Sequence, residues 1–163
     1  EQGSWCGETH IQKACYFLQK VLDVPLGYEF VLYRHGPFSF DLRNQLTALR
    51  ADKLLEIEPQ SPPYGPRLKT TELARKTQGL CPKTLGRYNR QLQFVAESLG
   101  GKGVIELERL ATALYVRESA GSKVPAEVLA EQLVRLKQHI GQAEALRAVQ
   151  QTDEIVEESK TVC

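Results

Sequence analysis

Residues 28–70 read YEFVLYRHGPFSFDLRNQLTALRADKLLEIEPQSPPYGPRLKT, and this stretch decides the fold that the sequence predicts. Its first six residues are mostly aromatic or aliphatic, which is typical of a strand on a half-buried surface. The corner at residues 34–37 ends that strand, because Pro37 fixes its own φ and biases Gly36 away from the α region. Ser39 can then cap a helix by accepting a hydrogen bond from a free backbone N–H.

The helix predicted after Ser39 has an apolar face and a polar face beside it. The apolar face recurs at spacings of four and three residues, which is the pattern of a helix packed on a core; it consists of Leu42, Leu46 and Leu49. The same spacing recurs one position further on, about 100° around the helix axis, at Arg43, Thr47 and Arg50. A recognition helix contacts a DNA groove through a face in that position.

Two short strands with a proline-rich loop between them predict a β-hairpin wing. In residues 54–58 apolar and acidic side chains alternate, and Glu56 and Glu58 fall on one side. If the strands pair, these glutamates lie opposite Arg67 and Lys69 and neutralise them, at roughly 0.2 to 1 kcal/mol per pair. The loop carries Tyr64 at its tip and no basic residue, so it suits a protein contact at least as well as a nucleic acid.

An amphipathic helix is predicted before this stretch, over residues 8–24. Its apolar stripe recurs at four, three and four residues, and Thr9 is the expected cap. We expect Gln12 and Lys13 on the exposed side of this helix, available to a partner. The stripe consists of Ile11, Cys15, Leu18 and Leu22.

From Pro82 onward the sequence predicts helices throughout. The first one starts at Pro82, a residue suited to the first helical position, and runs to residue 99. It leaves one face basic, at Lys83, Arg87 and Arg90. Further helices are predicted to reach residue 118, to run from Pro125 to about 140, and to run from 142 to about 158.

The predicted fold class is therefore α+β and mostly helical. Residues 1–78 form a winged-helix-like part, in the order helix, strand, helix and β-hairpin wing. Residues 79–163 form a helical bundle that packs against the first part, so we expect one compact domain. A chain of 163 residues with 42% hydrophobic and 25% charged residues fits a soluble domain of this kind.

The charges are balanced overall but unevenly distributed. The net charge is +1, yet residues 67–93 hold seven basic residues and one acidic residue. Among the last twenty residues, most of the charged ones are acidic. This asymmetry predicts either an anionic partner or self-association through the helical C-terminal part. The sequence has no run of about 18 apolar residues, so no membrane partner is expected.

The four cysteines are scattered and include no Cys-x-x-Cys pair. Such a distribution fits a reducing cytoplasm better than a disulfide scaffold, and Cys15 is expected as a small core residue. The chain contains no methionine, so we do not expect residue 1 to be a translation start. The cysteines are Cys6, Cys15, Cys81 and Cys163.

No catalytic or metal-binding pattern stands out, so we expect a protein that is not an enzyme and has no cofactor. His10, His35 and His139 are the candidate ligands or bases, but His10 and His35 flank turns and lack carboxylates at ligand spacing, and no orienting partner is evident, which favours structural histidines. Ser39 lacks the Gly-x-Ser-x-Gly sequence around a hydrolase nucleophile.

Three segments carry a resemblance to a known family. GETHIQK at residues 7–13, LGYEF at 26–30 and YRHGPFS at 33–39 resemble uncharacterised bacterial and archaeal proteins of the YwgA type. The chain is more distantly similar to the Panacea domain of antitoxins, which shares a Gln-Lys helix start and a Gly-Pro corner. The similarity extends to residues 110–112 and 136–137. The YwgA-like group implies no activity, whereas the Panacea domain implies toxin neutralisation or regulation.

Two functions remain open from the sequence. The first is a regulator that binds DNA through Arg43, Thr47 and Arg50, supported by the basic face at Lys83, Arg87 and Arg90. The alternative is a protein-interaction module of antitoxin or adaptor type. It would bind its partner through the corner and the wing, with the contact residues Gln12, Lys13, His35 and Tyr64.

Overall fold

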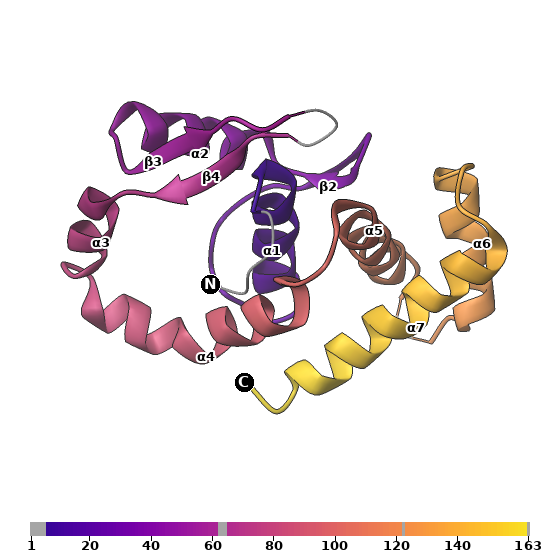
Figure 1. The fold of residues 1–163 in the computed structure, drawn as a ribbon. Coiled ribbons are helices and arrows are strands. Elements are labelled where there is room, and N and C mark those ends of the chain that lie inside the picture. Colours follow the sequence, from indigo (N-terminus) through magenta and orange to yellow (C-terminus); the bar gives the residue numbers. More distant parts are fainter. Residues whose placement is uncertain (1–5, 62–64, 122, 163) are drawn as a thin grey trace.

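The structure is a computed structural model that describes residues 6–61, 65–121 and 123–162. It is an α+β fold, mostly helical, and its N-terminal order of helix, strand, helix and hairpin followed by helices confirms the predicted fold class (Figure 1). The elements are α1 (Glu8–Lys20), β1 (Val31–Tyr33), β2 (Gly36–Phe38), α2 (Phe40–Ala51), β3 (Leu55–Glu58), β4 (Arg67–Thr70), α3 (Glu72–Gln78), α4 (Pro82–Leu99), α5 (Val104–Ala120), α6 (Ala126–Leu136) and α7 (Gln142–Ser159).

Helix α1 is shorter than predicted, and the strand after it starts later. The helix ends at Lys20, and its N-cap is Gly7, without a side-chain cap from Thr9. The Gln19 side chain donates to the Tyr28 carbonyl oxygen at 2.7 Å and accepts from the Tyr28 N–H at 2.9 Å. Because Gln19 accepts from the Tyr28 N–H, that donor is not available for strand pairing. Regular pairing begins only at Val31.

The predicted corner at residues 34–37 is part of a hairpin. Strands β1 and β2 pair antiparallel, with Val31 opposite Phe38 and Tyr33 opposite Gly36, so Arg34 and His35 form the turn. Gly36 has a φ of +81°, a conformation that glycine adopts without strain. The interpretation of residues 36 and 37 as a turn before α2 was therefore wrong.

Helix α2 and the hairpin β3–β4 follow the predicted pattern. The Ser39 hydroxyl accepts from the Leu42 N–H at 3.3 Å, and Leu42 and Leu46 are buried. In the hairpin, Glu56 pairs with Lys69 and Glu58 with Arg67. Lys69 also forms an ion pair with Glu58 at 3.0 Å, so the wing neutralises part of its own charge. Tyr64, at the tip, lies outside the described residues.

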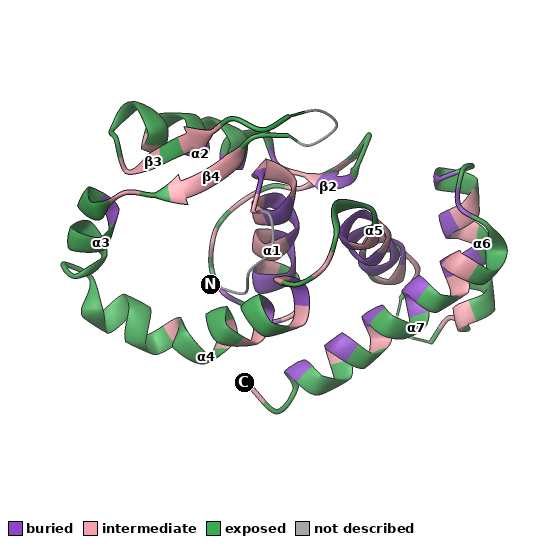
Figure 2. Cartoon of the chain, in the orientation of Figure 1, coloured by how far each residue is buried: buried purple, intermediate pink, exposed green. Residues whose placement is uncertain are grey.

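Helix α5 lies at the centre of the molecule and contributes to two hydrophobic clusters. One cluster joins it to α1 and the end of α4, and the other joins it to α6 and α7. Figure 2 shows buried positions on α1, α5 and the inner face of α7, whereas α3 and the first half of α4 are mainly exposed. No helix in the described part of the chain is long and apolar enough to cross a membrane.

Candidate functional site

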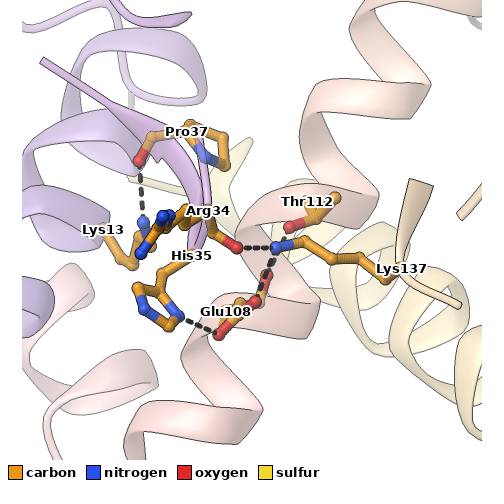
Figure 3. A network of polar contacts seen from close by, with 7 residues as sticks. All are labelled: Lys13, Arg34, His35, Pro37, Glu108, Thr112 and Lys137. Carbon is orange, nitrogen blue, oxygen red and sulfur yellow. Dashed lines mark hydrogen bonds and ion pairs between the residues drawn. The ribbon is translucent and has the colours of Figure 1, made fainter. Parts of the chain in front are cut away.

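The hairpin β1–β2 is attached to the helices by a buried polar cluster, which we call the polar junction (Figure 3). Its charged members are Lys13 on α1, Glu108 on α5 and Lys137, which follows α6. Lys13 Nζ donates to the Pro37 carbonyl oxygen at 2.7 Å. Lys137 Nζ donates to Glu108 Oε1 at 2.6 Å and to the Arg34 carbonyl oxygen. The junction thus holds the hairpin by its backbone from both sides.

His35 extends the junction to the surface. Its Nδ1 lies 3.0 Å from Glu108 Oε2, while 70% of its side chain is exposed. Glu108 therefore binds the hairpin turn through one carboxylate oxygen and Lys137 through the other. The prediction of His35 as a partner contact remains open, since the ring is accessible from outside.

Burial and charge set the protonation of the junction. Burial alone would raise the pKa of Glu108, but the hydrogen bonds and charges of Lys137 and His35 outweigh it and hold that pKa below its usual value. Burial lowers the pKa of Lys13 to about 8, even though the negative charge of Glu108 opposes the shift. Glu108 is consequently ionised at neutral pH, and Lys13 is close to its titration point.

Gly36 makes the close packing of the hairpin on α5 possible. A Cβ atom at this position would lie 2.7 Å from Thr112 Oγ1 and 3.4 Å from the Glu108 carbonyl oxygen. Thr112 is fixed in place, because it is fully buried and its hydroxyl donates to the Glu108 carbonyl oxygen at 2.7 Å. The residue at position 36 must therefore lack a side chain.

Gln12 fixes the start of α2 in a similar way. Its amide nitrogen donates to the Ser39 carbonyl oxygen, and its amide oxygen accepts from the Ser39 N–H, both at 2.9 Å. This is the pattern by which one strand pairs with another, supplied here by a side chain. Both residues are fully buried.

The prediction that Gln12 and Lys13 are exposed was therefore wrong. Both are at most 1% exposed, and both position the hairpin and α2 rather than offering a contact to a partner. A signal for this was present in the sequence: Tyr16 and Phe17 follow them by four residues, on the same helical face, and are buried as well. Cys15, expected in the core, is only half-buried.

The outer face of the hairpin carries aromatic side chains, which we call the aromatic surface. Its ring centroids lie 5.7 Å apart for Tyr33 and Phe38, 5.1 Å for Phe38 and Phe40, and 5.7 Å for Tyr33 and Phe40. Tyr33 and Phe40 are each 49% exposed. The Arg43 guanidinium lies over the Phe38 ring, 5.0 Å from its centroid. Four residues make up the surface: Tyr33, Phe38, Phe40 and Arg43.

The residues predicted to contact DNA on α2 are exposed, but they differ in their surroundings. Arg43 Nε donates to Glu8 Oε1 at 3.0 Å in addition to its contact with Phe38. Thr47 donates its hydroxyl to the Arg43 carbonyl oxygen at 3.1 Å. Arg50 forms no ion pair within the described residues. Of the two arginines on this face, Arg43 is therefore the one with an ion pair.

The basic face of α4 is a separate surface. Lys83, Arg87 and Arg90 are all exposed, and Arg87 lies over the Tyr88 ring. In Figure 1, α2 and α4 lie on opposite sides of the N-terminal part, with β3, β4 and α3 linking them. The structure therefore does not bring the two predicted sets of basic residues together on one face.

Within the described residues, no group of three His, Cys, Asp or Glu side chains is placed to hold a metal ion. His10 is buried, with Nε2 at 3.2 Å from the Lys102 carbonyl oxygen. No family model matches this chain, and no curated protein is significantly similar to it.

Proposed function

We propose that this protein is a protein-interaction module whose contact region is the aromatic surface of the hairpin β1–β2 and the start of α2. The observation that carries the proposal is the contact of three aromatic rings with one another and with Arg43 at an exposed position. Aromatic residues and arginine are enriched at protein interfaces and among the residues that dominate binding energy.

The fixed position of the hairpin supports the proposal. Ordering a loop or a set of side chains on binding costs free energy, and a surface that is already ordered avoids that cost. Gln12, Lys13 and Lys137 hold the backbone at Ser39, Pro37 and Arg34, which are the residues around the exposed rings. A partner would therefore meet the rings in the arrangement in which they bind.

Affinity capture with two matched variants tests this function. We expect the double variant Tyr33→Ser, Phe40→Ser to bind its specific protein partner with an affinity at least tenfold lower than that of the wild type, which corresponds to about 1.4 kcal/mol. The control is Ile105→Ser, which removes an apolar side chain that is 66% exposed on α5. Purified partner and chain are then titrated by calorimetry.

Thermal unfolding of both variants excludes a folding defect, since surface substitutions usually change stability by less than 0.5 kcal/mol. The proposal is overturned if the double variant captures every protein to the same extent as the wild type does. Loss of the same proteins with Ile105→Ser would also count against it, because the effect would not depend on the rings.

DNA binding is a second candidate, favoured by a different observation. Arg50 on α2 and the three basic residues on α4 are exposed and have no acidic partner in the described part of the chain. Basic side chains that neutralise phosphates give an affinity that falls steeply with salt. Fluorescence anisotropy with random-sequence duplex DNA over a salt series measures this dependence.

The two basic surfaces are tested separately, because α2 and α4 lie on opposite sides of the N-terminal part. DNA binding through α2 predicts that Arg50→Glu reduces the salt slope by about one, while Arg87→Glu reduces it only if α4 takes part. Absence of binding even at low salt contradicts this candidate and leaves the protein-interaction function.

A further inference from the structure

A groove of about 930 Å³ opens on a different part of the molecule, between α1, the hairpin β3–β4, α3 and α4 (Figure 1). Strand β4 lines it along its whole length, from Arg67 to Thr70. Within the described residues the sheet consists of β3 and β4 alone, so β4 has one edge that no strand covers. Such an edge can pair with a further strand.

The pairing of β3 with β4 decides which backbone groups of β4 face outward. The register places Thr71, just after β4, opposite Leu54, and the Thr71 N–H donates to the Leu54 carbonyl oxygen at 3.1 Å. In an antiparallel pair, residues that exchange hydrogen bonds alternate with residues that do not. Lys69, two residues earlier, therefore bonds to β3 as well, whereas the N–H and C=O groups of Leu68 and Thr70 point to the open edge.

One of these outward groups already bonds to backbone from outside the hairpin. The Leu68 N–H donates to the carbonyl oxygen of Cys6, which precedes α1, at 2.8 Å. The open edge of β4 is thus able to pair with another segment. The Leu68 C=O and the Thr70 N–H and C=O have no backbone partner within the described residues, and Thr70 is exposed.

The floor of the groove beside this edge is apolar. It is lined by Ile11 and Leu18 of α1 and by Leu92 and Val95 of α4. Leu92 is 40% exposed there, although it lies on the apolar face of α4. Side chains alternate between the two faces of a strand. Every second side chain of a strand added to β4 would therefore lie on the same face as Leu68, which also lines the groove.

We propose that this groove binds an extended peptide segment of a partner protein, which adds a strand to the open edge of β4. The Leu68 C=O and the Thr70 N–H and C=O pair with the peptide backbone, and apolar side chains at every second position of the peptide cover the floor between α1 and α4. In complexes of this kind main-chain hydrogen bonds provide affinity, and the contacts of alternate side chains provide specificity. The groove shares no residue with the aromatic surface, so the inference is independent of the function proposed above.

The probe that tests the proposal is the peptide fluorescein-Lys-Val-Thr-Val-Thr-Val-Lys-amide, in which valines alternate with threonines. We expect saturable binding of one peptide per chain, measured by fluorescence anisotropy. Thr70→Pro should weaken binding at least tenfold, because proline has no N–H, and the hairpin should tolerate it because this N–H faces outward from an edge strand. The matched control is Thr70→Val, which keeps the N–H and should bind as the wild type does.

Two N-methylated forms of the peptide test the backbone pairing without any change in the protein. One form carries methyl groups on the valine nitrogens and the other on the threonine nitrogens, and both keep every side chain. A strand directs alternate N–H groups to its neighbour, so only one of the two forms should lose binding, by at least tenfold. Equal affinities of the two forms, or of Thr70→Pro and Thr70→Val, overturn the proposal.

Two tryptophan substitutions on α4 test the position of the peptide. Ala96 lines the groove and is exposed, so the indole in Ala96→Trp fills the groove without disturbing the core. Glu97, the next residue, is exposed outside the groove. We expect Ala96→Trp to weaken binding at least tenfold and Glu97→Trp to leave it unchanged. Circular dichroism verifies that each variant is folded. Wild-type affinity in Ala96→Trp also overturns the proposal.

Hydrogen exchange identifies what occupies the edge. We expect the Thr70 amide to exchange at least tenfold more slowly with the peptide bound, while the Lys69 amide, bonded to β3, is protected in both states. Protection of Thr70 in the free chain overturns the proposal, because this chain would then cover its own edge. Protection that rises with protein concentration assigns the edge to a second copy and overturns it as well. These results are distinct from any outcome of the affinity capture, which concerns the aromatic surface.

Discussion

Gly36 combines two demands in one residue, a positive φ and an absent Cβ. We expect Gly36→Ala to destabilise the protein by about 2 to 4 kcal/mol, because it adds a clash with Thr112 to the strain of an alanine at φ +81°. The matched control is Gly27→Ala, where φ is +75° and nothing lies within 4 Å of the added atom. Urea unfolding should show a cost of only about 1 kcal/mol for Gly27→Ala. An equal loss of unfolding free energy in Gly36→Ala and Gly27→Ala would show that Gly36 is not packed tightly against α5.

Lys13 should make stability depend on pH in the alkaline range. Its pKa in the folded protein is about 8, below the ordinary value of 10.5, so between these values the unfolded chain binds more protons than the folded one. The free energy of unfolding contributed by this group therefore rises from pH 8 to pH 10.5, by about 2 to 4 kcal/mol at 1.36 kcal/mol for each pKa unit. Lys13→Met removes the titrating group while keeping an apolar chain.

Urea unfolding of wild type and Lys13→Met at several pH values isolates this effect from the other lysines and tyrosines. We expect the wild type to gain stability relative to the variant as the pH rises through this window. Parallel pH profiles of the two proteins would mean that Lys13 keeps its ordinary pKa in the folded state.

For single residues, the sequence predicts the capping role or the burial of a side chain correctly where its neighbours along the chain determine it. The capping of α2 by Ser39 and the burial of Leu42 and Leu46 follow from local patterns, and all three are confirmed. It failed for Gln12 and Lys13, because long polar side chains are normally exposed. Their burial depends on backbone groups of Ser39 and Pro37, more than twenty residues away, and local periodicity does not report such partners.

Among the elements, α2 depends on a side chain of α1 as well as on its own cap. We expect Ser39→Ala to cost about 1 kcal/mol, the usual value for a lost N-cap. Gln12→Met should cost more, about 2 to 3 kcal/mol, because it leaves the buried N–H of Ser39 without a partner and leaves the Ser39 C=O with the Arg43 N–H as its remaining donor. Both costs are measured by urea unfolding. A larger loss for Ser39→Ala would show that the cap, not the contact with α1, fixes the start of α2.

The two hairpins illustrate why one was predicted from the sequence and the other was not. In β3–β4 the alternation of apolar and charged residues and the proline-rich loop indicate both strands. Strand β2 has only three residues, two of which are Gly36 and Pro37, and these residue types usually indicate a turn. The contacts of β2 are distant in the sequence: Gly36 packs on Glu108 and Thr112, more than seventy residues further along the chain, and the Pro37 carbonyl oxygen accepts from Lys13. The predicted site on α2 stays a prediction: its residues Arg43, Thr47 and Arg50 are exposed.

For the whole molecule, α5 connects the two parts, residues 1–78 and 79–163, that the sequence predicted to pack against each other. Its residues Leu107, Leu110 and Leu114 pack with α1, whereas Ala113 and Val116 pack with α6 and α7. Tyr16 on α1 also donates its hydroxyl to Glu118 near the end of α5, at 2.5 Å. These contacts cross residue 78, the predicted boundary between the two parts.

The polar junction is the second link across the molecule, between the hairpin β1–β2 and the helices α1 and α5. A hairpin with three residues in each strand has marginal stability by itself. In this protein Lys137, which follows α6, donates to the Arg34 carbonyl oxygen, and Glu108 on α5 contacts His35 Nδ1. We therefore expect these long-range hydrogen bonds, rather than strand pairing, to keep the aromatic surface in place.

Hydrogen exchange of backbone amides in wild type and Lys137→Met tests that claim most directly, with Lys160→Met as a control for loss of an exposed ion pair. We expect Lys137→Met to reduce protection at residues 31–38 by at least tenfold, while the amides of α5 and α7 exchange nearly as in wild type. Lys160→Met should leave the hairpin unchanged. Wild-type protection of residues 31–38 in Lys137→Met, or an equal loss of protection throughout the chain, would contradict the role assigned to the junction.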